Sequence, residues 1–276
     1  MIPRRFQSAD AVVIGASDPV QTVEFLAAFG FGAHDTRIVS EAEASALYGL
    51  DHQSAETALR SPADPTGIAV VATPIAGAAP VDYDSGARAL DLYVSDIDAA
   101  TAEIEARLGA RSATSVSAVA TIDLGPVRMR QRMITGPDGL SVVLVESNMR
   151  RSSTLDHDPD RVISGVHSVV WVVPDRDAEA SWWQAEHGAT KGMDLAFSEP
   201  AVSDYLGLPD RPVDIAMTML SDADVSPCRL ELLEFAGRMQ PVRPDMVLTG
   251  GLWALRFTSG LPTATSTSPG GVRFQS

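Results

Sequence analysis

The chain has few residues of the kinds that build disulfide frameworks, multi-thiolate metal sites or basic surfaces. Of its 276 residues one is a cysteine, Cys228, so a single chain can form neither an internal disulfide nor a metal site made of several thiolates. The 21 basic residues are outnumbered by 36 acidic ones, and the formal net charge is −15. Because nucleic acids and anionic membrane surfaces attract basic patches, this balance argues against both as partners.

Long apolar runs are absent as well. No stretch approaches the roughly 20 apolar residues of a membrane-spanning helix, and the apolar run at residues 11–16 is too short for the core of a secretion signal. We therefore expect a cytoplasmic protein, in keeping with its single cysteine. A hydrophobic fraction of 45% beside a charged fraction of 21% is typical of globular proteins and predicts a sizeable core.

A weak repeat organises the chain. The strand-like segments VVIGASD, LDLYVSD and VVWVVPD end in Asp18, Asp96 and Asp175, and each is followed by an amphipathic helical pattern. An aspartate at this point is typical of a helix N-cap, because its carboxylate accepts backbone N–H bonds. The three aspartates are 78 and 79 residues apart. A period of this length predicts repeated modules that open with a strand and a helix and continue with further strands.

The remaining segments suggest four such modules in two halves. Residues 251–260 open a fourth module, but no helical pattern follows them, so this module looks truncated. The polar residues 149–161 read as a linker. We therefore predict an α+β protein with two domains of two modules each, at 9–148 and 162–276. An open sheet edge in the truncated module would favour pairing with a second copy, so we also expect a homodimer.

Several features of the repeated modules occur together. They are the strands that end in aspartate, the helix with the aromatic pair Trp182–Trp183, the Gly-Pro-Asp-Gly turn at 136–139 and the closing strands. This arrangement resembles the vicinal oxygen chelate superfamily, which includes glyoxalases, bleomycin-resistance proteins, extradiol dioxygenases and epimerases. The resemblance implies tandem βαβββ modules that form glyoxalase-like domains, in which curved sheets enclose a cavity. It also implies a divalent metal in many members, held by a histidine of a module's first strand and a glutamate of its last strand. We expect the tryptophan pair to pack its helix against the sheet.

The positions that the resemblance assigns to metal ligands are apolar in the first half of this chain. They fall on Ala11, Ala69, Ala89 and Val143, and none of these side chains can bind a metal. We therefore expect the first-half cavity to hold no metal, and we expect no other cofactor.

In the third module the corresponding positions fall on Ser168 and Glu231, with His167 one residue away. Because a shift of one residue turns a strand side chain to the opposite face, His167 is predicted to point away from Glu231 unless a bulge precedes Ser168. A metal site made by His167 and Glu231 stays open as the alternative.

Two polar residues share the predicted cavity face of the second module. Strand alternation from Ala89 places Asp91 and Tyr93 on that face. A buried carboxyl and a phenol on one wall could act as acid–base group and hydrogen-bond donor, which makes them our catalytic candidates. The alternative is a purely structural hydrogen bond involving this pair.

Substrate-binding candidates come from the other strands of the first half. Arginines and the sequence Met-Gln-Met alternate over residues 128–133, so one set faces the cavity and the other faces solvent. Inward arginines would bind a carboxylate, whereas an inward Met-Gln-Met set would make an apolar and adaptable wall. The candidates are Val13, Arg128, Arg130, Gln131 and Val143.

Two hypotheses of different kinds follow for the function. The first is a metal-independent enzyme, a lyase or isomerase that acts on a small apolar or aromatic molecule. The second is a non-catalytic protein that binds or sequesters such a molecule, as bleomycin-resistance proteins do; a metal-dependent glyoxalase or dioxygenase that uses His167 and Glu231 is a third. In each case the partner is a small-molecule substrate or ligand. A segment at residues 39–62, which reads as a helix and a strand, is a candidate lid over the first cavity.

Overall fold

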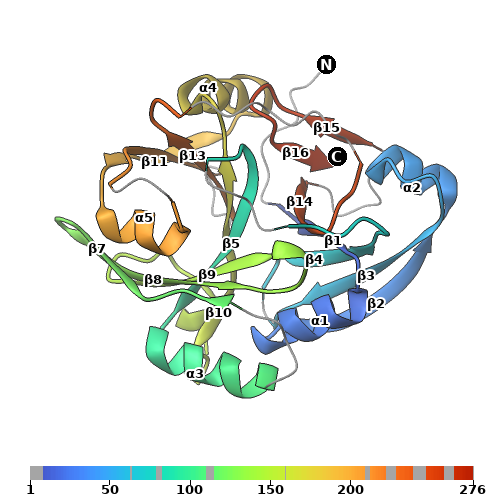
Figure 1. The fold of residues 1–276 in the computed structure, drawn as a ribbon, viewed down its shortest axis with the longest axis horizontal. Helices are drawn as coiled ribbons and strands as arrows, with labels where there is room; N and C mark the ends of the chain where they lie inside the picture. Colours follow the sequence, from blue (N-terminus) through green and yellow to red (C-terminus); the bar gives the residue numbers. More distant parts are fainter. Residues whose placement is uncertain are drawn as a thin grey trace.

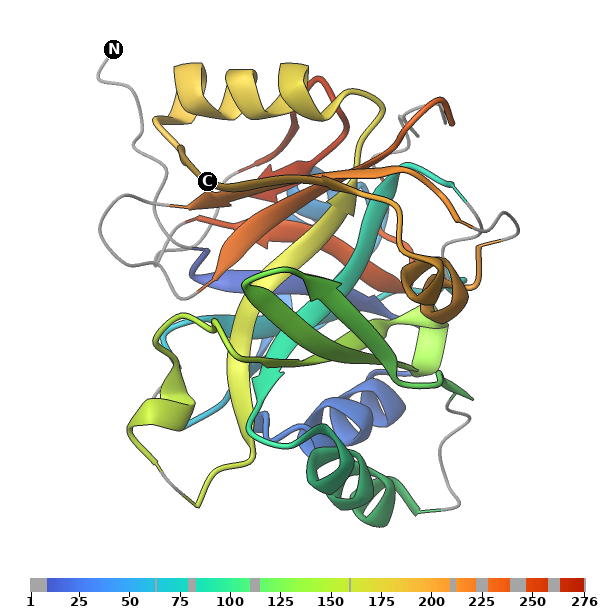
Figure 2. The same ribbon diagram turned by 90° about the vertical axis from the view of Figure 1, so that its left-hand side faces the viewer.

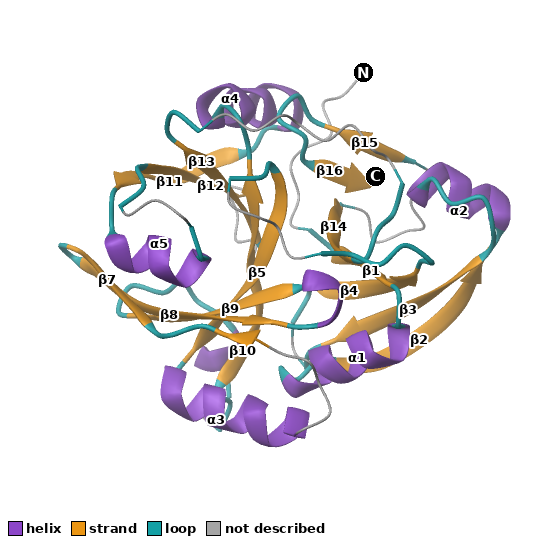
Figure 3. Cartoon of the chain, in the orientation of Figure 1, coloured by secondary structure: helices purple, strands orange, loops and turns teal. Residues whose placement is uncertain are grey.

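The structure is a computed structural model that describes residues 9–62, 64–78, 83–109, 115–158, 160–208, 212–221, 228–238, 247–257 and 264–275. The helices of these ranges are α1 (Pro19–Ala28), α2 (Glu41–Tyr48), α3 (Ile97–Leu108), α4 (Arg176–His187) and α5 (Pro200–Leu206). Figure 3 shows them around two groups of strands. Within the described ranges, no helix has the length and apolar character needed to cross a membrane.

The described strands form two sheets (Figure 1). The seven-stranded sheet contains, in chain order, β1 (Ala11–Ala16), β2 (Gly32–Val39), β3 (Ser54–Arg60), β4 (Gly67–Ala72), β14 (Gly251–Arg256), β15 (Thr265–Thr267) and β16 (Arg273–Gln275). The nine-stranded sheet contains β5 (Gly86–Val94), β6 (Ser115–Val116), β7 (Ala120–Leu124), β8 (Val127–Thr135), β9 (Ser141–Ser147), β10 (Ile163–Val172), β11 (Thr190–Phe197), β12 (Ile215–Ser221) and β13 (Arg229–Phe235).

The predicted N-caps of the three module helices are confirmed. The carboxylate of Asp18 accepts the N–H of Gln21, Asp96 caps α3 in the same way, and Asp175 caps α4. Each aspartate follows a buried strand directly, so it both ends the strand and begins the helix. Helices α1 and α3 pack side by side, as Figure 2 shows at the bottom of the molecule.

The two sheets do not follow the predicted division of the chain. Strand β1 pairs with β14, and β5 pairs with β10, both antiparallel. Each sheet therefore combines strands from 9–148 and from 162–276, and the expectation that consecutive modules pair within each half is wrong. The physical reason is that the opening strand of every module offers a free edge. Sequence repeats reveal the modules, but tertiary packing decides which edges meet.

The fourth module continues as strands in its described residues, without a helix, in keeping with the predicted truncation. Phe274 of β16 packs against both Trp182 and Trp183 of α4, with ring centroids 6.1 and 5.2 Å apart. Glu179 of α4 accepts hydrogen bonds from the Trp183 indole and from the N–H of Gly270. The C-terminal strands thus cover α4, and the tryptophan pair packs in the core as predicted.

The predicted linker at 149–161 is anchored to the first module. It contains a 3₁₀ turn at Thr154–Asp156 with a capping box from Ser153. The guanidinium of Arg161 donates to the carbonyl oxygens of Ile163 and Pro62 at 2.7 Å each. The segment is therefore tied by side-chain hydrogen bonds to the loop that follows β3.

Candidate functional site

The nine-stranded sheet curves around a cavity of about 370 Å³. Its wall takes side chains from the second and third modules, because β5 and β10 join these modules into one sheet. Charged and polar groups gather on one part of the wall: Asp91, Tyr93, His167, Arg229 and Glu231. All five are at most 8% exposed.

A bulge in β10 brings His167 to this cavity. Val166 pairs with Leu92 and Ser168 pairs with Asp91, so His167 is an extra residue between two consecutive residues of β5. The extra residue is the exception that we allowed for, and His167 lines the cavity together with Glu231. The expectation that His167 points away is therefore wrong, because strand alternation fails where one strand has a residue more than its partner.

Asp91 and Glu231 form a buried carboxyl pair. The two carboxyls interact closely enough to shift each other's pKa, and the Ser168 hydroxyl donates to Asp91 Oδ2 at 2.8 Å. Burial raises the pKa of both carboxyls, and the negative charge of Asp91 raises the pKa of Glu231 further. With the pKa of Asp91 raised to about 6 and that of Glu231 to about 8, one carboxyl is charged and the other keeps its proton near neutral pH.

Arg229 organises two rings beside this pair. Its Nη2 donates to the Tyr93 hydroxyl and to His167 Nδ1, each at 3.1 Å. The rings of Tyr93 and His167 are stacked, with centroids 3.7 Å apart and an interplanar angle of 9°. Both rings thus lie over one guanidinium, which holds them in place.

This arrangement sets the protonation of His167. Burial lowers its pKa well below the ordinary value, and the positive charge of Arg229 adds to the effect. Because a guanidinium only donates, Nδ1 must accept and the single ring proton lies on Nε2. Among the residues that the structure describes, that buried Nε2 has no hydrogen-bond partner.

The donor set of this cavity does not fit the divalent metal that the superfamily implies. His167 and Glu231, the alternative ligands, do lie on one cavity, but Nδ1 of the histidine accepts from Arg229 and its Nε2 carries the proton. Glu231 keeps its proton near neutral pH, and the positive charge of Arg229 already lies among these groups. The described part of the chain contains no group of three or more histidine, cysteine, aspartate or glutamate side chains that could hold a metal ion.

The substrate-binding candidates of β8 lie on opposite faces of the strand, as the alternation of side chains requires. Gln131 and its neighbour Met129 line the cavity. Arg128 and Arg130 lie on the outer face, where Arg128 Nε pairs with Asp123 at 3.2 Å and Arg130 pairs with Glu146 and Asp98 at 3.1 and 2.8 Å. The two arginines therefore do not reach the cavity, whereas Met129 and Gln131 line it and Met133 packs against the neighbouring apolar cluster.

The other two substrate-binding candidates lie apart. Val143 pairs in register with Asp91 and belongs to the apolar cluster that contains Tyr93. Val13 is in the seven-stranded sheet, fully buried in a different cluster with Tyr48 and Trp253. Its predicted place beside Asp91 assumed that the first two modules pair, and the strand pairing contradicts this.

Several cavity residues have no counterpart among the candidates. Arg229 and Arg151 belong to the polar part, and methionines line much of the apolar part: Met129, Met149, Met193, Met217 and Met219. Alternation along β12 and β13 would have found Met217, Met219 and Arg229, because they share a face with Glu231 in a register that pairs Met219 with Glu231.

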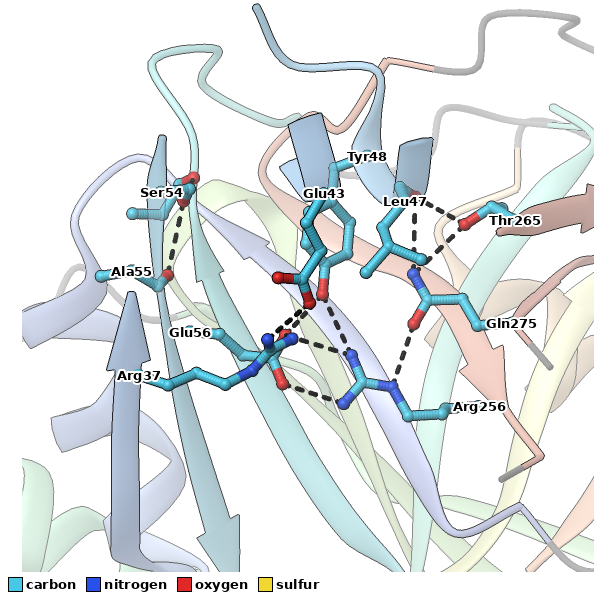
Figure 4. A network of polar contacts seen from close by, with 11 residues as sticks. Arg37, Glu43, Leu47, Tyr48, Ser54, Ala55, Glu56, Arg256, Thr265 and Gln275 are labelled. Atoms are coloured by element: carbon cyan, nitrogen blue, oxygen red, sulfur yellow. Dashed lines mark hydrogen bonds and ion pairs between the residues drawn. The ribbon is translucent and has the colours of Figure 1, made fainter. Parts of the chain in front are cut away.

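The matching face of the seven-stranded sheet is filled (Figure 4). Arg256 of β14 bonds both oxygens of Glu56 at 2.9 and 3.2 Å, and it donates to the Tyr48 hydroxyl at 3.0 Å and to Gln275 Oε1 at 3.0 Å. Arg37 adds a further bond to Glu56 at 2.9 Å. The predicted helix and strand of residues 39–62 are α2 and β3, but Tyr48 plugs this face instead of covering a cavity.

No protein-family model and no curated protein matches the chain. Solved structures do. A glyoxalase I variant from Zea mays has a TM-score of 0.61 at 12% identity, over 97% of this chain and 91% of that one. Glyoxalase I from Zea mays itself has a TM-score of 0.55 at 13% identity, over 84% and 69% of the two chains. A proposed dioxygenase from Bacillus subtilis has a TM-score of 0.56 at 13% identity, over 99% and 85%.

At these identities the similarity establishes the fold alone. The chain has the vicinal oxygen chelate fold, an α+β arrangement of βαβββ modules, which confirms the predicted fold class. The chemistry has to be argued from the cavity of the nine-stranded sheet.

Proposed function

We propose that the protein is a metal-independent lyase or isomerase that moves a proton on a small apolar or aromatic molecule bound in the cavity of the nine-stranded sheet. The observation that carries this proposal is the Asp91–Glu231 pair, two buried carboxyls on the cavity wall whose pKa values are both raised by burial. Catalysis by general acids and bases needs both protonation states within reach of the substrate, and this pair offers both near neutral pH.

The proton transfer follows from that pair. Its ionised carboxyl takes a proton from a substrate carbon next to a carbonyl, and the C–H electron pair delocalises onto the carbonyl oxygen. The protonated carboxyl then returns a proton to another carbon, as in an isomerase, or to a leaving group, as in a lyase. The charge of Arg229 and the donors that it holds, Tyr93 and His167, stabilise the developing oxygen anion.

The apolar wall supports the proposed substrate class. Methionines of β8, β11 and β12 line the same cavity as the carboxyls, and Met219 pairs in register with Glu231. Their unbranched, polarisable side chains adapt to flat or irregular apolar groups and contact aromatic rings favourably. A cavity of about 370 Å³ is at the small end of the usual range for small-molecule sites.

Deuterium exchange tests the proposal without knowledge of the product. The protein is incubated in D₂O with a panel of aryl ketones and α-aryl carboxylates, and deuterium at the carbon next to the carbonyl is followed by NMR. We expect exchange on at least one compound and its loss in Asp91→Asn and in Glu231→Gln. Arg128→Gln, an exposed change on the outer face, serves as the control and should exchange normally.

The second candidate is a non-catalytic protein that sequesters an apolar molecule, as bleomycin-resistance proteins do. The methionine wall favours it, because such a wall alone is enough for binding. The two proposals differ at Asp91: a sequestering protein would bind its ligand but exchange no deuterium. The third hypothesis, a metal-dependent glyoxalase or dioxygenase, is disfavoured because the donor atoms of His167 and Glu231 do not fit a divalent metal.

A cytoplasmic location and a homodimer remain proposals as well. The motive for the dimer is the short fourth module, whose strands β15 and β16 form one edge of the seven-stranded sheet. Sedimentation at micromolar concentration tests it, and a single monomeric species would contradict it.

A further inference from the structure

We infer that Arg229 is the binding group for an anionic oxygen of the ligand, so that the cavity takes a small apolar or aromatic anion, a carboxylate or an enolate. The inference deepens the proposed function, because it rests on the same cavity as the ligand site. It does not depend on turnover.

The first observation is that Arg229, a buried cation, has no direct salt bridge in the described part of the chain, although the Asp91 and Glu231 carboxyls feel its charge at longer range. It is 8% exposed and lines the cavity. Its hydrogen-bond partners are the phenol of Tyr93 and the ring nitrogen of His167, both neutral, and its buried Nε has no partner among the described residues. A buried charge is costly unless it is paired. An anionic oxygen in the cavity would supply the missing partner.

The second observation is a pair of unused donors beside that cation. The Tyr93 hydroxyl accepts from Arg229 Nη2 and, at 3.4 Å, from the N–H of Arg151, so its own proton is left to donate. His167 Nε2–H is likewise without an acceptor in the described part of the chain. Two donors and one cation on the same wall, with no protein acceptor, are complementary to an oxygen that carries negative charge.

The charge of the cavity wall points the same way. Arg151 and Arg229 both line the cavity, and His167 is neutral. The Asp91–Glu231 pair contributes one negative charge, because one of its carboxyls keeps its proton. Arg229 is buried, whereas Arg151 is exposed and its charge is screened by solvent, so the wall favours an anion over a cation.

Three compounds of nearly equal shape provide the test: phenylacetate, 2-phenylacetamide and phenethylamine. They present an anionic, a neutral and a cationic group on the same aromatic part. Affinities are measured by calorimetry or by ligand-observed NMR at concentrations up to about 10 mM, where even weak fragments bind measurably. We expect phenylacetate to bind at least about tenfold more tightly than the amide, and the amine not to bind.

Variants assign the preference to named groups. In Arg229→Gln we expect the preference for the acid to vanish, and in Tyr93→Phe we expect it to fall by a few fold. Arg128→Gln, an exposed arginine on the outer face of the same sheet, is the matched control and should leave the preference unchanged. Circular dichroism checks that each variant is folded.

A measurement on the wild type keeps the inference testable if Arg229→Gln does not fold. The ¹⁵N shifts of His167 should report an unprotonated Nδ1 and a protonated Nε2, with Nε2–H shifting when phenylacetate is added. Equal affinity for acid and amide, no binding by the acid, or an unmoved Nε2–H would each overturn the inference. Deuterium exchange on neutral ketones without any preference for acids would support the proposed function and contradict this inference. Preferential binding of the acid without any exchange would support this inference and contradict the proposed function.

Discussion

The two sheets each contain a buried arginine, and the two arginines differ in whether a carboxylate pairs with them directly. Arg256 of the seven-stranded sheet is neutralised by Glu56 and bonded to Tyr48 and Gln275. Arg229 of the nine-stranded sheet bonds a phenol and an imidazole and has no carboxylate partner among the described residues. Arg256 stabilises the fold through a direct ion pair, whereas Arg229 has neutral hydrogen-bond partners and feels the charge of Asp91 and Glu231 only at longer range. A buried cation without a direct ion pair can bind an anionic ligand.

The same contrast holds for the carboxyls. Burial alone would raise the pKa of Glu56, but hydrogen bonds and charge from Arg256, with further bonds from Tyr48 and Arg37, lower it to about 2. Burial raises the pKa of Glu231, and the neighbouring Asp91 raises it further. A carboxyl that is permanently charged serves structure, whereas one that titrates near neutral pH can exchange protons with a ligand.

A short helix in each odd module accounts for the difference. Helix α2 lies between β2 and β3, and α5 lies between β11 and β12, so they are equivalent insertions. Tyr48 at the end of α2 reaches Glu56 and Arg256 and fills the concave face of its sheet. Helix α5 packs on β7 and β8 and leaves the cavity of the other sheet open.

The largest effect should come from breaking the filled network. Arg256→Gln leaves Glu56 buried with Arg37 as its remaining cationic partner, and loss of one partner of a buried pair costs roughly 3–5 kcal/mol. Because Arg37 still donates to Glu56, we expect the lower end of that range. Arg229→Gln should cost less than about 1 kcal/mol, since it removes an unpaired buried charge. Urea unfolding of both variants checks the difference, and equal losses would remove the comparison on which the ligand inference rests.

Asp91→Asn should separate function from stability. The change removes a buried carboxylate whose pKa is raised by burial. We therefore expect the melting temperature to stay the same or rise, and the free energy of unfolding at neutral pH to increase by up to about 1 kcal/mol. Deuterium exchange on a substrate should fall by about a hundredfold or more, as for loss of a general base. Thermal unfolding and exchange are measured on the same preparation, with Asp123→Asn as an exposed control. A less stable variant with normal exchange would make Asp91 structural.

The two glutamates should give opposite pH dependences of stability. The pKa of Glu231 is raised from 4.5 to about 8 in the folded protein, so its contribution is present below pH 4.5 and is lost as the pH rises toward 8. Relative to Glu231→Gln, the wild type should lose up to about 1.4 kcal/mol per pH unit in that window. Glu56, with a lowered pKa, contributes above pH 4.5 and loses that contribution as the pH falls toward 2.

Unfolding free energies at pH 5, 6.5 and 8 for the wild type, Glu231→Gln and Glu56→Gln check this prediction. As the pH rises, the free energy of unfolding of the wild type must fall further below that of Glu231→Gln. The gap to Glu56→Gln must stay in favour of the wild type throughout. Parallel curves for wild type and Glu231→Gln would show that the Asp91–Glu231 pair does not retain a proton.

The smallest effect should come from Tyr93→Phe. The change removes the hydroxyl that Arg229 contacts but keeps the ring that stacks on His167. We expect a stability change of less than about 1 kcal/mol and a loss of affinity for phenylacetate of a few fold. Val145→Ile, an apolar change at a residue that lines the cavity, is the control for altered shape. An unchanged affinity in Tyr93→Phe would limit the anion site to Arg229.

The sequence by itself determined the local elements and the choice of cavity wall in the second module. Asp18, Asp96 and Asp175 cap their helices because the cap needs only residues within one turn. Asp91, Tyr93 and Gln131 face the cavity because strand alternation is local. The repeat of 78 and 79 residues revealed the modules, and with them the fold class.

Only the tertiary structure decided which modules share a sheet and which charges lack a partner. Pairing β5 with β10 joins residues that lie 69 to 86 positions apart in the chain, and no local pattern specifies such a pairing. The same pairing contains the bulge that turns His167 toward the cavity, so the side chains of β10 do not alternate regularly at this point. Arg229 and Arg256 both look like ordinary strand arginines in the sequence. They differ because Glu56 lies 200 residues from Arg256 in the chain yet within hydrogen-bond reach, whereas no described carboxylate pairs with Arg229.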